Sequence, residues 1–101
     1  MAERRETPRV PVEEDCTLSL DGREVQVRVE DYSDIGARMR VLGPSQDVVT
    51  DNDLGTEVTF RILRSLPARE CTGEIIRRYF KDGVQYIALR FWKKCRDIPR
   101  A

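Results

Sequence analysis

The chain has 101 residues, enough for one domain with a modest core and too few for two. Its 18 basic residues balance its 18 acidic ones, and zero net charge disfavours a general DNA or RNA binder, whose affinity would rest on a basic surface. No apolar run approaches the roughly 20 residues that span a bilayer, and the N-terminus carries no signal-peptide pattern. We therefore expect a soluble, cytoplasmic protein with no membrane insertion.

Residues 1–12 contain no periodic pattern. Pro8 and Pro11 block a helix and favour extended backbone before them. Arg5 and Arg9 then lie about 13 Å apart on an extended segment, at ~3.3 Å per residue. They form two arms that could close around a group of nucleotide size.

The rest of the chain alternates apolar and polar residues, which is typical of strands with one wet face. Asp21-Gly22 and Asp82-Gly83 are signals for two-residue hairpin turns. Gly43 to Gly55 reads as a long exposed loop, and the tail has room for at most a short helical turn before Pro99. The expected strands are Cys16–Leu20, Glu24–Glu30, Ala37–Leu42, Val58–Ile62, Glu70–Tyr79 and Val84–Trp92.

Six strands in hairpin series, without an amphipathic helix, predict an all-β fold, either a small antiparallel barrel or a sandwich. A closed barrel would remove exposed sheet edges. We expect a flexible arginine segment over residues 1–12, the β-domain over 13–95 and a solvated tail over 96–101.

Catalysis and metal binding lack a signature. The chain has no histidine, and no nucleophile motif or glycine-rich phosphate loop is present. Its three cysteines, Cys16, Cys71 and Cys95, are too far apart in sequence for a zinc motif, so we expect reduced thiols that act as small apolar residues. Asp31 and Asp34 could form a carboxylate pair or a hard-cation site, but turn residues are the favoured interpretation. We predict no enzyme, no metal and no cofactor.

The segment from Asp31 to Gly36 joins two predicted strands. Its pattern, Asp31-x-Ser33-x-x-Gly36, suits a polar turn, in which Asp and Ser bond nearby amides. Glycine there allows positive φ or the close approach of a ligand. Strand parity places Asp31 in step with Val27 and Val29, so a bend or bulge must turn it outward.

Together, Arg4-Arg5-x-x-x-Arg9 and Asp31-x-Ser33-x-x-Gly36 resemble the PilZ family, bacterial receptors for cyclic di-GMP. Both motifs are complete and in the usual order. The resemblance implies a six-stranded split barrel and a ligand-binding set of Arg4, Arg5, Arg9, Asp31, Ser33 and Gly36. The two motif arginines would clamp the nucleotide against an outer floor. Arg4 would go with binding of an intercalated ligand pair, and Arg77 is a candidate for the same surface.

The chemistry of cyclic di-GMP agrees with this interpretation. Arginine forks match the N7 and O6 acceptors of guanine and the phosphate oxygens, and a carboxylate accepts from guanine N–H groups. The resemblance implies a receptor that converts ligand binding into a changed surface for a downstream protein. Two alternatives remain at this point: a PilZ-like protein-interaction module that binds no nucleotide, and a small barrel that binds single-stranded nucleic acid through aromatic platforms.

Overall fold

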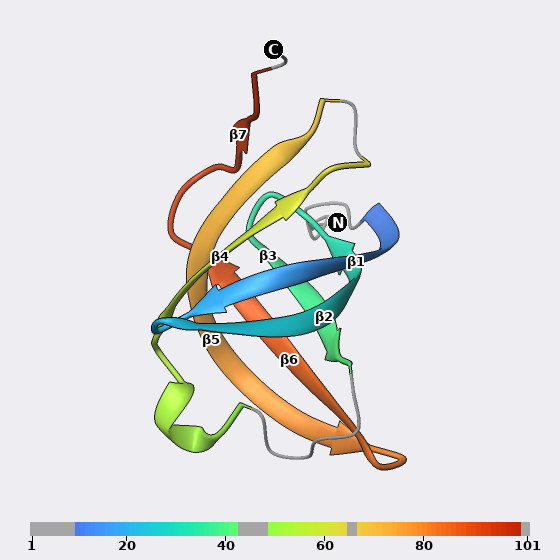
Figure 1. Ribbon diagram of the computed structural model, residues 1–101, viewed down its shortest axis with the longest axis vertical. Helices are drawn as coiled ribbons and strands as arrows, with labels where there is room; N and C mark the ends of the chain where they lie inside the picture. The colour runs from blue at the N-terminus through green and yellow to red at the C-terminus, as the bar shows by residue number, and fades with distance from the viewer. Residues whose placement is uncertain (1–9, 43–48, 65–66, 100–101) are drawn as a thin grey trace, which may run out of the picture.

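The computed structural model describes residues 10–42, 49–64 and 67–99. Strands run in the order β4-β1-β2-β3-β6-β5-β7, all neighbours are antiparallel, and β4 also pairs with β5 (Figure 1). This extra pairing closes the first six strands into a barrel and confirms the predicted fold class. The elements are β1 (Val10–Leu20), β2 (Arg23–Tyr32), β3 (Gly36–Val41), a 3₁₀ turn (Asp51–Asp53), β4 (Glu57–Ile62), β5 (Arg69–Lys81), β6 (Val84–Phe91) and β7 (Arg96–Asp97).

The apolar members of each alternating run fill the barrel. On β2 these are Val25, Val27 and Val29, and each is at most 4% exposed. On β6, Ile87 and Leu89 are equally enclosed, while their polar or small neighbours face outward. Burial of one face of every strand supplies the main stabilisation of this small domain.

Both predicted hairpin turns form. Asp21 and Gly22 have φ values of 50° and 79°, and Asp82 and Gly83 have 53° and 78°. Two consecutive positive φ values define the turn whose twist matches that of the flanking strands. The strands therefore begin and end close to the predicted positions on either side of these dipeptides.

The C-terminal segment differs from the prediction. In place of a helical turn, Arg96 and Asp97 form β7, which pairs with Glu70 and Arg69 at the start of β5 (Figure 1). The backbone N–H of Ile98 also donates to the carbonyl of Ala68 at 2.8 Å. The open edge of β5 offers hydrogen-bond partners along this stretch, whereas a single helical turn would satisfy few backbone groups.

The expectation of free thiols is wrong for two cysteines. Cys71 on β5 and Cys95 just before β7 form a disulfide, with their Cα atoms 4.4 Å apart. Their separation of 24 residues gave no signal in the sequence, because the return of the chain beside β5 brings them together. Cys16 is the free cysteine among the described residues.

The barrel is split between β1 and β4. These strands pair only at Ser19↔Thr59 and Leu20↔Val58 within the described residues. Beyond those pairs the strands diverge, and the Glu14 carboxylate bridges the gap by accepting the backbone N–H groups of Leu63 and Arg64 at 2.9 and 3.0 Å. A side chain thus replaces part of the missing strand ladder.

No helix among the described residues is long and apolar enough to cross a membrane.

Candidate functional site

A β-bulge turns Asp31 to the outside of the barrel, as the strand parity predicted. The β2–β3 register shifts between Val29, which opposes Met39, and Asp31, which opposes Arg38. Glu30 is the extra residue, so the side-chain alternation changes phase here. Asp31 accepts a hydrogen bond from Arg38 at 3.0 Å on the outer face. Arg38 is half exposed, so this ion pair contributes little to stability.

Ser33 closes the turn after β2. Its backbone N–H donates to the carbonyl of Gly36 at 2.9 Å, and its Oγ accepts the N–H of Ile35 at 3.2 Å. The residue is only 4% exposed. These bonds use the hydroxyl as an acceptor and leave its proton available for donation.

Gly36 lies where β3 approaches the backbone of β6. A Cβ added there would be 2.2 Å from the carbonyl oxygen of Leu89, so no other residue fits without moving a strand. The N–H of Phe91 donates to Ile35 at 2.8 Å and ties the turn to β6. The motif therefore forms a rigid outer turn held by two strands.

The strand β1 begins beside this turn. In the β1–β2 ladder, Val10 opposes Tyr32 and Pro11 opposes Asp31. The sequence-predicted Arg4, Arg5 and Arg9 lie outside the described residues. Arg9 directly precedes Val10, the first residue of β1, in the sequence.

Further arginines lie on the same outer face. Arg38 on β3 opposes Ala88 on β6, which opposes Arg77 on β5, so the interpretation that Arg77 shares this face is confirmed by register. Arg90 opposes Gly36 directly. Sequence reasoning did not single out Arg38 or Arg90. The alternation along β3 and β6 indicates that both side chains point outward. It does not show that they lie near the turn, which depends on the order of the strands in the sheet.

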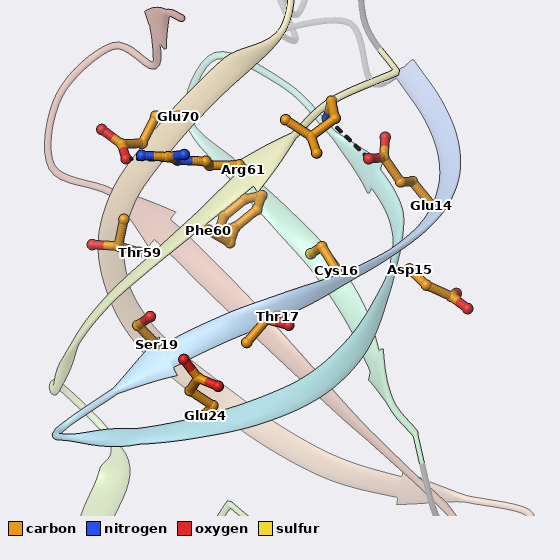
Figure 2. A pocket seen from close by; sticks show the side chains of 11 residues that line it. Glu14, Asp15, Cys16, Thr17, Ser19, Glu24, Thr59, Phe60, Arg61 and Glu70 are labelled. Atoms are coloured by element: carbon orange, nitrogen blue, oxygen red, sulfur yellow. Dashed lines mark hydrogen bonds and ion pairs between the residues drawn. The ribbon is translucent and has the colours of Figure 1, made fainter.

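The split between β1 and β4 contains a cavity of about 480 Å³, and most of the charged side chains that line it are acidic (Figure 2). Burial, together with the carboxylates of Glu14 and Asp15, raises the pKa of the Cys16 thiol in this cavity to about 12. A negative field of this kind disfavours an anionic ligand. Its acidic lining residues are Glu14, Asp15, Glu24 and Glu70, and Arg61 is the basic one.

No cluster of histidine, cysteine, aspartate or glutamate side chains suited to a metal ion occurs among residues 10–42, 49–64 and 67–99. An anion-binding function is better served by the β2–β3 turn and its flanking arginines than by the acidic split.

Comparison with protein families gives a match to the PilZ domain over residues 3–97. The chain belongs to the PilZ domain family. The match includes the whole N-terminal arginine motif, the β2–β3 turn and all the strands of the barrel. Comparison with curated proteins found no significant match. PilZ domains form a family of cyclic di-GMP receptors.

Proposed function

We propose that this PilZ protein is a cyclic di-GMP receptor with no catalytic activity of its own. The observation that carries the proposal is the pairing of Pro11 with Asp31, which attaches the arginine-bearing segment beside an outward-facing turn. A ligand on that turn would lie within reach of the preceding arginines. Family membership over residues 3–97 supports the same ligand.

Each residue of the two motifs would contact a different part of the ligand. Arg5 and Arg9 would clamp guanine and phosphate through forked donors, and Arg4 would help to hold a second, intercalated molecule. Asp31 would accept guanine N–H groups. The Ser33 proton, unused inside the turn, would go to a phosphate or guanine acceptor.

Gly36 would let the turn pack tightly enough to serve as a floor. Arg38 and Arg90 would add positive charge around the site.

Signal output would come from the ordering of the N-terminal segment. Ordering costs conformational entropy, which the charge-assisted bonds must exceed. The ordered segment and bound nucleotide would present a new surface to a downstream protein in the cytoplasm. This mechanism needs no DNA, RNA or cofactor.

Calorimetric titration with cyclic di-GMP tests the proposal and gives the stoichiometry. We expect micromolar or tighter binding that weakens with salt. Arg5→Ala or Arg9→Ala should weaken it at least about tenfold, because a charged hydrogen bond contributes roughly 1.5–3 kcal/mol.

Arg61→Ala is the matched control, since Arg61 lies on β4 and pairs with Glu70 at 3.1 Å, away from the turn. Affinity that is unchanged in both motif variants would reject the clamp.

The second candidate function is a PilZ-like protein-interaction module without nucleotide binding. It is favoured by the bonds that Asp31 and Ser33 already make to Arg38 and Ile35, which give both residues a structural role. The absence of any shift in the backbone amide signals of Asp31 to Gly36 at saturating nucleotide would support this alternative.

A further inference from the structure

Residues 96–99, which we name the tail segment, lie along the first residues of β5 and bury little apolar surface (Figure 1). Arg96 and Asp97 are exposed, and Ile98 is only partly buried. The backbone is held by the two residue pairs of β7 and by the bond from Ile98 N–H to the carbonyl of Ala68. So short a strand forms few hydrogen bonds to offset the conformational freedom that it loses.

The ion pairs of the tail segment are too exposed to hold it in place. The Nε of Arg96 donates to Glu70 at 2.9 Å, and Asp97 lies 3.6 Å from the Nε of Arg69. The two tail side chains are 68% and 65% exposed. Ion pairs at such positions contribute little, because water and salt screen them. The attachment of the tail segment therefore depends on the covalent bond beside it.

That bond is the disulfide between Cys71 and Cys95, which directly precedes the tail segment. Cys71 is fully buried in the barrel core, whereas Cys95 is only partly buried. Cys95 is thus the more accessible of the two to a reductant, and the exposed Lys93 and Lys94 before it attract a negatively charged thiolate. A buried thiol packs as a small apolar residue, so the core can keep Cys71 in either state.

We propose that the Cys71–Cys95 disulfide is a redox switch, whose reduction releases the tail segment and opens the edge of β5 at residues 68–70. The inference rests on the proposed function, because a cyclic di-GMP receptor works in the cytoplasm, where disulfides are rare and those that form are usually transient. A permanent covalent attachment is therefore not expected there.

A small dithiol is the class of reductant that the switch requires. One of its thiolates attacks the Cys95 sulfur, the S–S bond breaks, and the Cys71 thiolate leaves. The second thiolate then displaces Cys95, and the reductant becomes a cyclic disulfide. The two protons of the dithiol pass to the two cysteines, and two electrons move with them. Attack by a cysteine thiolate on a disulfide of the same class reverses the step.

Reduction would change both the backbone edge and the charge at this end of the barrel. In the oxidised form β7 covers Arg69 and Glu70, and Ile98 occupies the Ala68 carbonyl. In the reduced form these backbone groups would be open, as they are at a sheet edge that can accept another strand. Glu70, which also lines the split, would lose Arg96 and keep Arg61. The β4–β5 ladder that closes the barrel lies on the other side of β5 and would remain.

NMR spectra of the whole protein, recorded without nucleotide, test the switch. The protein is held in glutathione buffers from fully oxidised to the most reducing ratio found in cytosol, and mass spectrometry after thiol labelling counts the free cysteines. A separate sample is reduced completely with dithiothreitol. The amide signals of residues 96–98 report on the tail segment, and those of β4 and β6 report on the barrel.

We expect both cysteines to be reduced within the cytosolic range of glutathione ratios. The signals of residues 96–98 should then move to unstructured positions, and exchange of the Ile98 amide should speed up at least about tenfold. The barrel signals should stay dispersed. Hydrogen bonds from Arg96 and Arg61 lower the pKa of Glu70, so this pKa should rise when Arg96 leaves. Removal of the reductant in the presence of oxidised glutathione should restore the first spectrum.

Two variants separate the disulfide from other effects of the reductant. Cys95→Ser should show the released tail segment under every condition. Cys16→Ser is the matched control and should switch as the native chain does, since Cys16 is unpaired.

Three results would overturn the proposal. The bond would stay oxidised at the most reducing cytosolic ratio, which would make it a permanent attachment. The dithiothreitol-reduced protein would keep the protection of Ile98, which would show that hydrogen bonds alone hold the tail segment. Alternatively, the signals of β4 and β6 would collapse together with those of the tail, so that no local release occurs. Because no nucleotide is present, failure to bind cyclic di-GMP in the calorimetric titration is a separate result and would count against the proposed function.

Discussion

The motif has glycine at position 36 because the backbone of β6 leaves no room for a side chain there. The residue has no positive φ; instead, the Leu89 carbonyl would lie 2.2 Å from an added Cβ. We predict that Gly36→Ala forces β3 and β6 apart and lowers the free energy of unfolding by about 1–3 kcal/mol, the usual cost of overpacking. Urea denaturation measures this loss.

Asp34→Ala is the control for Gly36→Ala, because Asp34 is exposed in the same turn and should change stability by less than about 0.5 kcal/mol. Equal stability of Gly36→Ala and the native chain would contradict the close approach.

The residues of the turn show which features of the candidate site could be predicted from the sequence. The outward position of Asp31 followed from strand parity, which demanded a bulge, and the bulge lies between Val29 and Asp31. The bond from Ile35 N–H to Ser33 Oγ is local and typical of serine in turns. The position of Arg38 and Arg90 near the turn could not be inferred, because it depends on β3 pairing with β6.

Among the elements, β7 depends on covalent as well as hydrogen bonds. The Cys71–Cys95 disulfide closes a loop of 24 residues next to this two-residue strand. We predict that Cys95→Ser lowers the free energy of unfolding by about 3 kcal/mol in the chain-entropy account. It should also speed hydrogen exchange of the Ile98 amide, which bonds to Ala68. Thermal unfolding with and without a thiol reductant measures the first effect.

Cys16→Ser is the matched control, since Cys16 is unpaired. Reductant should destabilise this variant as much as the native chain and should leave Cys95→Ser unchanged. Insensitivity of the native chain to reductant would contradict a stabilising bond.

The strands themselves were largely predictable because period-two alternation and Asp-Gly turns are local signals. The six long strands and both hairpins follow from them. The ends of the strands were harder to predict from the sequence. β1 begins at Val10 because it finds β2 as a partner, and β7 forms because β5 has an open edge. Both facts depend on contacts between segments far apart in the sequence.

At the scale of the whole molecule, zero net charge conceals a separation of charge. Arginines occupy the outer face of β3, β6 and β5, whereas four acidic side chains line the split between β1 and β4. The arginine-bearing surface is therefore the more favourable of the two for an anion. The two surfaces are connected through β1, which contacts Asp31 at one end and β4 at the other.

Glu14 is the contact through which β1 holds the split together. Its side chain is 8% exposed and accepts two backbone N–H groups, from Leu63 and Arg64. We predict that Glu14→Ala leaves both donors unsatisfied and lowers the free energy of unfolding by about 2 kcal/mol. Amide exchange of Leu63 and Arg64, followed by NMR, should accelerate more than exchange on β6.

Asp15→Ala provides the comparison for Glu14→Ala, because Asp15 is an exposed neighbour that pairs with Arg28 and should cost less than about 1 kcal/mol. Under the proposed function, cyclic di-GMP orders the segment before β1 and so restrains Glu14. The nucleotide should then slow exchange of the Leu63 and Arg64 amides in the native chain and in Asp15→Ala, but not in Glu14→Ala. Equal slowing in all three proteins would show that ligand binding reaches the split by a route other than this carboxylate.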